Sequence, residues 1–297
     1  MFNRHIYTVL EAVRIVLYCI HLLSSAEIGK IVVMGGCGRV GLPLALNLSI
    51  AGFNAVSVDV SQTAIEKVMG GKFPFEEERG DQYLQVALRK GYRATSDAAE
   101  YKDADIVVLI TGMNVDLFGN PELGLLKDHF EFAVQNSNAN TFFIFRSTLS
   151  PGTMELLQRH LNELTGRTDA HLRMAYCPER TAEKVALEEI QVLPQIVSAF
   201  SDEAFNKAWS VFSKVTVTGI RLTPVEAEVA KLLANSWRYC EFAISNYFYI
   251  KLSKLLNGNF HKVCRVLQIA HTISMYCPFI ISPTPHAFLP GLGQHQT

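Results

Sequence analysis

The sequence of 297 residues lacks an excess of charge of either sign, a CxxC motif and a long uninterrupted apolar run. It has 27 basic and 28 acidic residues, so no net field favours nucleic acid or an anionic membrane surface, and we expect no nucleic acid as a partner. The six cysteines show no metal-ligand spacing, which predicts reduced thiols, a cytoplasmic location and no metal site. Because 49% of the residues are hydrophobic, the chain is expected to be globular.

The segment 1–28 differs from the rest of the chain. Its apolar stretch from Ile6 to Leu23 is interrupted by Glu11, Arg14 and His21, whereas a membrane-spanning helix needs about 20 nearly uninterrupted apolar residues. The same interruptions argue against a signal peptide. We therefore predict an amphipathic helical extension that packs on the main domain, on a partner or on a membrane surface, and no transmembrane segment.

Short apolar runs alternate with helical periodicity between Lys30 and Val217. This alternation predicts an α/β fold with a doubly wound parallel sheet of the Rossmann type, which we assign to residues 29–220. The expected strands are Ile31–Met34, Ala55–Val60, Ile106–Ile110, Thr141–Phe145, Leu172–Tyr176, Ile196–Ala199 and Val215–Val217. The expected helices lie around Leu44–Ile50, Ile65–Val68, Lys127–Gln135, Met154–Leu164 and Glu203–Phe212.

A second region begins after Pro224. The segment Val225–Leu256 contains neither glycine nor proline and predicts one long helix, whose many aromatic side chains indicate a surface that needs covering. We assign 221–297 to a central helical domain. Its tail from Cys277 onward holds too many prolines and glycines for regular structure.

A GxGxxG motif, Gly36-Cys37-Gly38-Arg39-Val40-Gly41, stands between an expected strand and an expected helix. In this context the glycines allow a tight turn, the approach of a pyrophosphate and close packing of helix on strand. Asp59 follows about 20 residues later, where a carboxylate accepts hydrogen bonds from the ribose of NAD and repels the 2′-phosphate of NADP. We therefore predict NAD binding at Gly36, Gly38, Arg39, Val40, Gly41 and Asp59. Two alternatives remain, since FAD domains use a similar turn and the glycines alone could serve the turn.

Four segments together resemble the UDP-glucose/GDP-mannose dehydrogenase family, especially members acting on UDP-N-acetylhexosamines such as UDP-N-acetylmannosamine. The segments are Gly36–Ala45 (GCGRVGLPLA), Arg146–Thr153 (RSTLSPGT), Tyr176–Ile190 (YCPERTAEKVALEEI) and Glu226–Tyr239 (EAEVAKLLANSWRY). The resemblance implies oxidation of the C6 hydroxyl of a UDP-sugar to the uronate with two NAD per substrate. It also implies a homodimer formed through the central helix.

The resemblance further implies roles for single residues. Thr148 would lie near the nicotinamide and help to place a water, and Glu179 would act as a general base or orient that water. Lys231 and Asn235, four positions apart in the long helix, would stabilise a developing oxyanion. Substrate contacts are expected from Glu179, Arg180, Lys231, Asn235 and Arg238, and a cofactor contact from Thr111. Without these motifs, such polar residues are ordinarily exposed surface residues.

The sequence departs from the family pattern in two places. The family continues from a glycine-rich LPGPG-like stretch into a GPCLxKD segment that bears the nucleophilic cysteine, whereas here Leu289–Gly293 is followed by Gln294–Thr297. We therefore expect the C-terminal UDP-binding domain to be missing and full catalysis to be impaired, with no substitution by Cys277. The second departure is Ile110–Asn114 (ITGMN), where the family has a Thr-Pro pair.

Two functions thus stand against each other. One is an NAD-dependent UDP-sugar 6-dehydrogenase; the other is an NAD-binding, dimerising module that completes no oxidation. The cysteines Cys37, Cys177 and Cys240 are expected to be packing residues in either case. A bare aromatic surface on the long helix would also make the chain prone to aggregation.

Overall fold

The computed structural model describes residues 28–111, 114–115 and 121–252. The predictions for the amino-terminal extension, apart from Ile28, and for the tail from Cys277 onward concern residues outside these ranges. Within the described ranges no helix is both long and apolar enough to cross a lipid bilayer.

The described residues fall into two compact units. The first holds 28–111 and 122–228, and the second holds 114–115, 121 and 229–252. A small two-stranded sheet pairs β5 (Asn114–Val115) with β6 (Pro121–Glu122).

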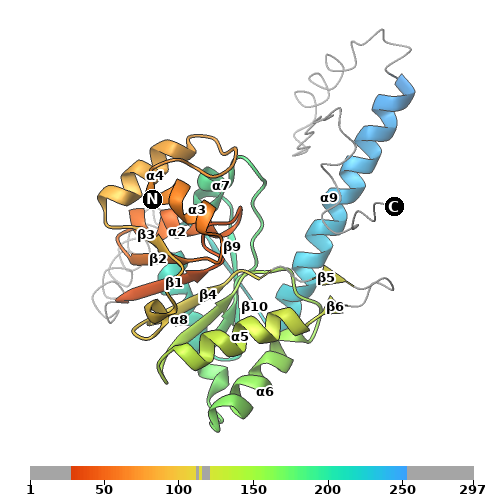
Figure 1. Cartoon of the computed structure of the whole chain (residues 1–297). Helices are drawn as coiled ribbons and strands as arrows, with labels where there is room; N and C mark the ends of the chain where they lie inside the picture. Colours follow the sequence, from red (N-terminus) through yellow and green to blue (C-terminus); the bar gives the residue numbers. More distant parts are fainter. Residues whose placement is uncertain (1–27, 112–113, 116–120, 253–297) are drawn as a thin grey trace, which may run out of the picture. The chain divides into compact units, whose positions relative to one another are not determined.

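The first unit is built on an eight-stranded sheet with the order β10-β9-β8-β7-β4-β1-β2-β3 (Figure 1). Its strands are β1 Lys30–Met34, β2 Asn54–Val58, β3 Arg93–Thr95, β4 Ile106–Leu109, β7 Phe142–Phe145, β8 Met174–Tyr176, β9 Gln195–Ala199 and β10 Gly219–Leu222. The six strands from β8 to β3 are parallel. Strand β9 is antiparallel to β8, and β10 runs parallel to β9. The predicted Rossmann-type sheet is therefore confirmed, with one edge of reversed direction.

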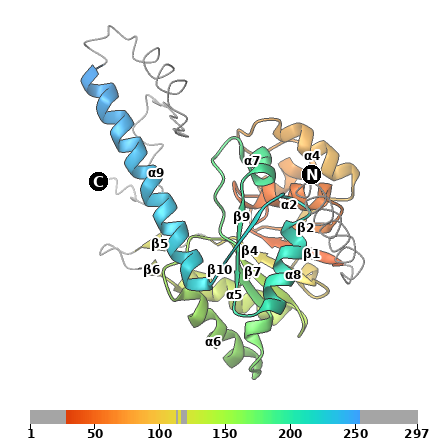
Figure 2. The same cartoon turned by 180° about the vertical axis from the view of Figure 1, so that it is seen from behind.

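Helices cover both faces of this sheet. They are α2 Gly41–Ile50, α3 Gln62–Met69, α4 Gly80–Arg89, α5 Gly124–Asn136, α6 Thr153–Thr165, α7 Ala186–Val192 and α8 Asp202–Phe212, with the 3-10 helices η1 Ala98–Tyr101 and η2 Ala170–Leu172. On one face α2 contacts α4 and α7, and on the other α5 packs against α6 (Figures 1 and 2).

The central strands are buried on both faces, which explains their unbroken apolar sequences. In β7, Phe142 and Ile144 belong to the core that includes α2. Their neighbours Phe143 and Phe145 instead meet Phe130 of α5 edge to face, with ring centroids 5.3 and 5.0 Å apart. The alternation of a strand's side chains thus gives the sheet two hydrophobic layers.

Six of the seven predicted strands are present, with ends shifted by one or two residues. The seventh prediction, Val215–Val217, is wrong, because these residues form no strand and the next strand, β10, begins only at Gly219. The backbone N–H groups of Val215 and Thr216 donate to the carbonyl of Phe212 at 2.9 and 2.8 Å, so this apolar run closes α8. Val217 is 85% exposed, as befits a residue in a turn.

The long helix α9 spans Pro224–Leu252, which confirms the predicted helix Val225–Leu256 within the described residues. A capping box fixes its start. The N–H of Thr223 donates to Oε2 of Glu226 at 2.8 Å, and the N–H of Glu226 donates to Oγ1 of Thr223 at 3.4 Å. Proline in the first turn adds to the same signal, since its missing N–H is not needed there.

Candidate functional site

Predicted site residues lie at the carboxyl ends of five neighbouring strands. Glu179 follows β8, Thr148 follows β7, Thr111 follows β4, the glycine turn 36–41 follows β1 and Asp59 follows β2. Because these strands are parallel, their carboxyl ends form one edge of the sheet. In open α/β sheets this edge is where ligands bind, so the fold brings the predicted cofactor and reaction positions together.

The glycines of the turn serve different needs. A Cβ at Gly36 would collide with Ser57, and one at Gly41 would collide with the carbonyl of Gly35. A Cβ at Gly38 would meet only the carbonyl oxygen of Gly35, at an ordinary 3.4 Å. The fold therefore requires glycine at two of these positions. At Gly38 the fold itself leaves room for a side chain, so glycine at this position suits the close approach of a phosphate to the backbone.

Helix α2 begins at this turn without a side-chain cap. Its N-cap residue Val40 makes no capping hydrogen bond, and its first turn holds no acidic residue. The N–H of Leu42 donates to the carbonyl of Gly38 at 3.0 Å, which closes the turn onto the helix. Uncapped N–H groups and the positive end of the helix dipole bind anions. The turn therefore fits the pyrophosphate of a dinucleotide.

Asp59 is tied to the glycine turn. The N–H of Cys37 donates to Oδ2 of Asp59 at 2.9 Å, and the N–H of Ser61 donates to Oδ1 at 3.0 Å. The next side chain, Val60, is fully exposed and was missed by the sequence analysis. A fixed carboxylate beside an apolar surface fits the ribose and the base of an adenosine. Burial, and secondarily the charge of Asp59, raises the pKa of the Cys37 thiol to about 12, so this thiol stays protonated.

Glu179 is buried and receives hydrogen bonds at both carboxylate oxygens. Its Oε2 forms an ion pair with Nη2 of Arg146. Its Oε1 accepts from the N–H groups of Arg180 and Thr181 at 2.6 and 2.8 Å. Burial alone would raise the pKa of Glu179, but the charge of Arg146 and these hydrogen bonds outweigh it and lower the pKa. A carboxylate of lowered pKa is a weak base, so this environment favours orienting a ligand over abstracting a proton.

Arg146 is the partner that the sequence analysis missed. It is 1% exposed, and its Nη1 donates to the carbonyl of Cys177 and to Oε1 of Gln195, each at 3.1 Å. Its guanidinium also lies 5.1 Å from the ring centroid of Phe212. The sequence did hold a signal for this pair, because Arg146 directly follows the apolar strand β7. An arginine at such a position is expected to be buried, and a buried guanidinium needs acceptors.

A second buried carboxylate, Glu228 of α9, holds the turn that follows Thr148. It is 0% exposed, and its oxygens accept from the N–H groups of Gly152 and Met154, each at 2.7 Å. Burial raises the pKa of Glu228, and these hydrogen bonds only partly oppose that effect. The carboxylate caps the start of α6 and so fixes the loop that carries Thr148.

The remaining predicted residues are placed as follows. Thr111 is buried, and its Oγ1 lies 3.0 Å from Nδ1 of His129 on α5, a partner not predicted from the sequence. Lys231, Asn235 and Arg238 belong to the second unit and share one side of α9, at intervals of four and three residues. Their convergence with the edge of the sheet stays a prediction.

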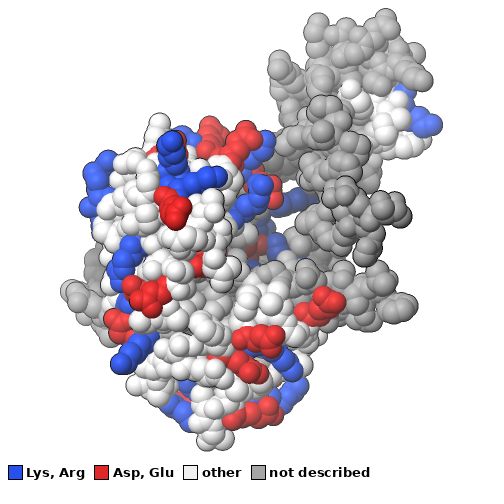
Figure 3. Space-filling model, viewed as in Figure 1, with Lys and Arg blue, Asp and Glu red and all other residues white. Residues whose placement is uncertain are grey.

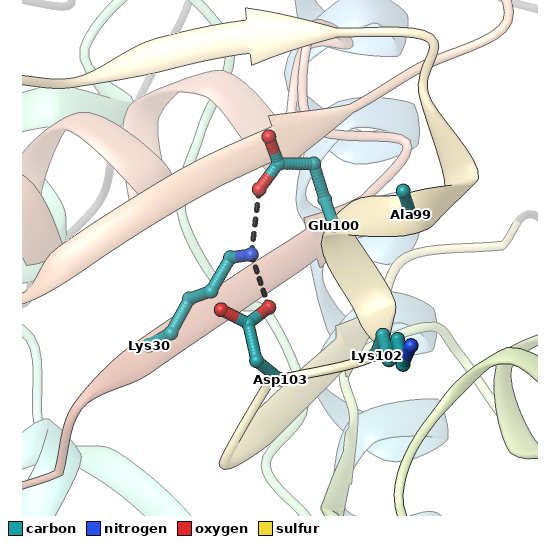
Figure 4. Close-up of a pocket in the computed structure, with 5 residues that line it drawn as sticks. All are labelled: Lys30, Ala99, Glu100, Lys102 and Asp103. Atoms are coloured by element: carbon teal, nitrogen blue, oxygen red, sulfur yellow. Dashed lines mark hydrogen bonds and ion pairs between the residues drawn. The ribbon is translucent and has the colours of Figure 1, made fainter.

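A hollow of about 470 Å³ lies at the opposite, amino edge of the sheet (Figure 4). It is lined by Lys30, Ala99, Glu100, Lys102 and Asp103. The Nζ of Lys30 lies between Oε2 of Glu100 at 2.6 Å and Oδ1 of Asp103 at 2.5 Å. These ion pairs fasten the first residue of β1 to η1 and the loop after it. The hollow is therefore a structural junction, separate from the carboxyl edge.

The surface carries charges of both signs (Figure 3), and two of the described cysteines are buried. In the face shown by Figure 3, acidic and basic side chains are interspersed. No group of His, Cys, Asp and Glu within the described ranges could hold a metal ion. Cys37 and Cys177 are buried, as predicted for packing residues, and burial raises the pKa of the Cys177 thiol to about 12. The prediction is wrong for Cys240, because its position on α9 is exposed.

The fold and the glycine turn define a dinucleotide-binding domain of the Rossmann type. The chain belongs to the UDP-glucose/GDP-mannose dehydrogenase family, whose NAD-binding domain matches residues 29–215. The resemblance stated from the sequence motifs is thereby confirmed. NAD is confirmed as the cofactor of this domain.

Relatives within the family act on different nucleotide sugars. The chain is 28% identical over 215 residues to a UDP-N-acetyl-D-mannosamine dehydrogenase of Pyrococcus horikoshii, covering 72% of this chain and 51% of the relative. It is 26% identical over 219 residues to a GDP-mannose 6-dehydrogenase of Pseudomonas syringae pv. tomato, covering 71% of this chain and 50% of the relative. The chain thus spans about half the length of the curated relatives it matches.

Solved structures of the family share the fold. A UDP-D-ManNAc dehydrogenase from Pyrococcus horikoshii aligns with a TM-score of 0.71 at 24% identity, over 82% of this chain and 58% of that chain. A GDP-mannose dehydrogenase from Pseudomonas aeruginosa aligns with a TM-score of 0.71 at 22% identity, over 82% of this chain and 57% of that chain. Both likenesses support the α/β architecture.

Proposed function

We propose that the chain serves the NAD-dependent oxidation of the C6 hydroxyl of a UDP-hexose to the uronate. UDP-N-acetylmannosamine or another UDP-N-acetylhexosamine is the substrate we favour, because relatives named for that sugar match most of the chain. The observation that carries the proposal is the line of motif residues along one edge of the sheet, from Asp59 through the glycine turn to Thr148 and Glu179.

The cofactor half of this proposal rests on the geometry of the turn. Gly36, Gly38 and Gly41 shape it, and the N–H groups near Val40 and the side chain of Arg39 face the pyrophosphate. Asp59 would bind the adenosine ribose, and Thr111 and Thr148 would contact the cofactor, Thr148 near the nicotinamide. Bound NAD supplies the hydride acceptor. The protein's task at this edge is to hold and orient it.

The substrate half assigns roles to residues of both units. Thr148 and Glu179 place a water, and Arg180 contacts the substrate. Orienting is the role that the surroundings of Glu179 favour, since its pKa is lowered. Lys231 and Asn235 stabilise a developing oxyanion with a cation and an amide donor, and Arg238 adds a substrate contact.

Domain roles and assembly belong to the same proposal. Residues 29–220 form the NAD-binding domain, and 221–297 belong to a central helical domain that forms a homodimer through α9, in the cytoplasm. Several large apolar side chains of α9 are exposed, namely Leu233, Trp237, Tyr239, Ile244, Tyr247, Phe248 and Ile250. Such a surface suits a second copy of the chain. A monodisperse monomer in light scattering would contradict this part.

A second candidate function is an NAD-binding, dimerising module without complete oxidation. It is supported because the family model matches the NAD-binding domain, at residues 29–215, and this module needs only that domain and the helix α9. Incomplete catalysis by this chain belongs to this candidate and is tested by turnover.

The discriminating experiment measures NADH formation with UDP-N-acetylmannosamine, UDP-N-acetylglucosamine and UDP-glucose, alongside calorimetric NAD binding. Sustained NADH formation with one sugar supports the dehydrogenase. NAD binding without turnover supports the second candidate. Loss of both would contradict the assignment of the cofactor site.

A further inference from the structure

Arg39 of the glycine turn is held between two loops. Its Nη1 lies 3.2 Å from Oε2 of Glu183, in the loop 177–185 between β8 and α7. Its guanidinium also lies over the ring of Phe75, 5.6 Å from the centroid, in the loop 70–79 between α3 and α4. The side chains of the ion pair are 59% and 70% exposed, so a charged ligand can reach the pair from solvent.

The two loops are also joined to each other. The N–H of Glu78 donates to the carbonyl of Lys184 at 2.7 Å, and Nζ of Lys184 lies 2.9 Å from Oε2 of Glu76. Arg79 pairs with Glu188 at 2.7 Å. Lys184 and Arg79 have φ values of 76° and 57°, a conformation that side chains other than glycine seldom adopt. Such outliers persist where the surroundings hold the backbone in place, so the residue before Lys184 is presented to the turn in a fixed position.

We propose that Glu183 competes with the pyrophosphate of NAD for the guanidinium of Arg39. The proposal rests on the role of Arg39 in the proposed function. A guanidinium binds phosphate oxygens in bidentate fashion, and a pyrophosphate carries more negative charge than one carboxylate, so the exchange favours the ligand. Glu183 therefore lowers the affinity for the dinucleotide.

The test is calorimetric titration of the whole chain with NAD at low salt. We expect Glu183→Gln to bind NAD roughly two- to fivefold more tightly than the parent, the effect of losing one exposed ion pair. Glu188→Gln is the matched control, because it also removes one exposed carboxylate, whereas Glu188 of α7 pairs with Arg79 and not with Arg39. Its affinity for NAD is expected to equal that of the parent.

A double-mutant cycle with Arg39→Gln separates the competition by Glu183 from the proposed role of Arg39 in binding the cofactor. Arg39→Gln is expected to weaken NAD binding, and adding Glu183→Gln to it should then change nothing further. If Arg39→Gln weakens binding but Glu183→Gln gives no gain, or the same gain as Glu188→Gln, the competition is overturned and the cofactor role of Arg39 stands. If Arg39→Gln leaves the affinity unchanged, both the competition and that role are overturned.

Discussion

The turn after β8 and the turn before α6 each depend on a buried carboxylate, and the two carboxylates are held differently. Glu179 faces the guanidinium of Arg146, and its pKa is lowered. Glu228 receives hydrogen bonds from the N–H groups of Gly152 and Met154, and its pKa is raised. Backbone N–H donors at a helix N-terminus can thus satisfy the oxygens of a buried carboxylate. A buried cation beside the carboxylate is what lowers its pKa and so favours the ionised form.

The largest effect is expected from Glu179→Gln. The substitution leaves the guanidinium of Arg146 buried without a counter-charge, and loss of one partner from a buried ion pair costs about 3–5 kcal/mol. The free energy of unfolding in urea measures this cost. Glu183→Gln, four residues away and exposed, serves as the control and should lose less than about 1 kcal/mol. Equal losses in the two variants would contradict the importance of the Arg146 pair.

Glu228→Gln should have a smaller effect. The amide keeps one acceptor for the N–H groups of Gly152 and Met154 but leaves no buried charge behind. We expect the free energy of unfolding to fall by about 1–3 kcal/mol, the cost of an unsatisfied buried polar group. A loss as large as that of Glu179→Gln would show that the two turns depend on their carboxylates in the same way.

The pH dependence of these two losses should have opposite signs. The folded-state pKa of Glu179 is lowered, so its stabilisation is present above the glutamate range near 4.5 and is lost as the pH falls through the folded pKa. The folded-state pKa of Glu228 is raised, so its contribution is complete below about 4.5 and is lost as the pH rises. In melting curves as the pH is lowered from 7 to well below 4.5, the deficit of Glu179→Gln should shrink and that of Glu228→Gln should grow. Deficits that change together would refute the contrast.

The smallest effect is expected from Glu188→Gln, which removes an exposed ion pair with Arg79. The side chains are 55% and 45% exposed, so solvent screens the pair and its loss should cost less than about 1 kcal/mol. Urea unfolding of this variant beside the two buried ones measures how much burial matters. A loss above that of Glu228→Gln would overturn the ranking.

Local sequence signals predicted the parts of the fold and site that depend on neighbours in the chain. The strands were found because apolar runs such as FFIF are buried on both faces, and the glycine turn was found because its motif is continuous. Asp59 was found because the distance from the glycines to the second strand is set by one helix and two turns. The capping box at Thr223 is a local feature of the same kind.

The parts that were missed depend on contacts between distant residues. The pairing of Arg146 with Glu179 joins positions 33 residues apart, and Gly152 meets Glu228 across 76 residues. Neither pairing leaves a periodic pattern in the sequence. The reversal of β9 was missed for the same reason, since strand direction depends on the connection through the fold. At Val215–Val217 an apolar run closes a helix, which periodicity alone cannot distinguish from a strand.

The central claim, that the glycine turn binds NAD, is tested most directly by calorimetric titration of Gly38→Ala against Gly124→Ala. A Cβ meets no atom within 4 Å at Gly124 and only one, at 3.4 Å, at Gly38, so both variants should fold like the parent. We predict that Gly38→Ala weakens NAD binding by about tenfold or more, because its methyl group occupies the approach of the pyrophosphate, while Gly124→Ala binds like the parent. Equal NAD affinity of the two variants would contradict the assigned cofactor site.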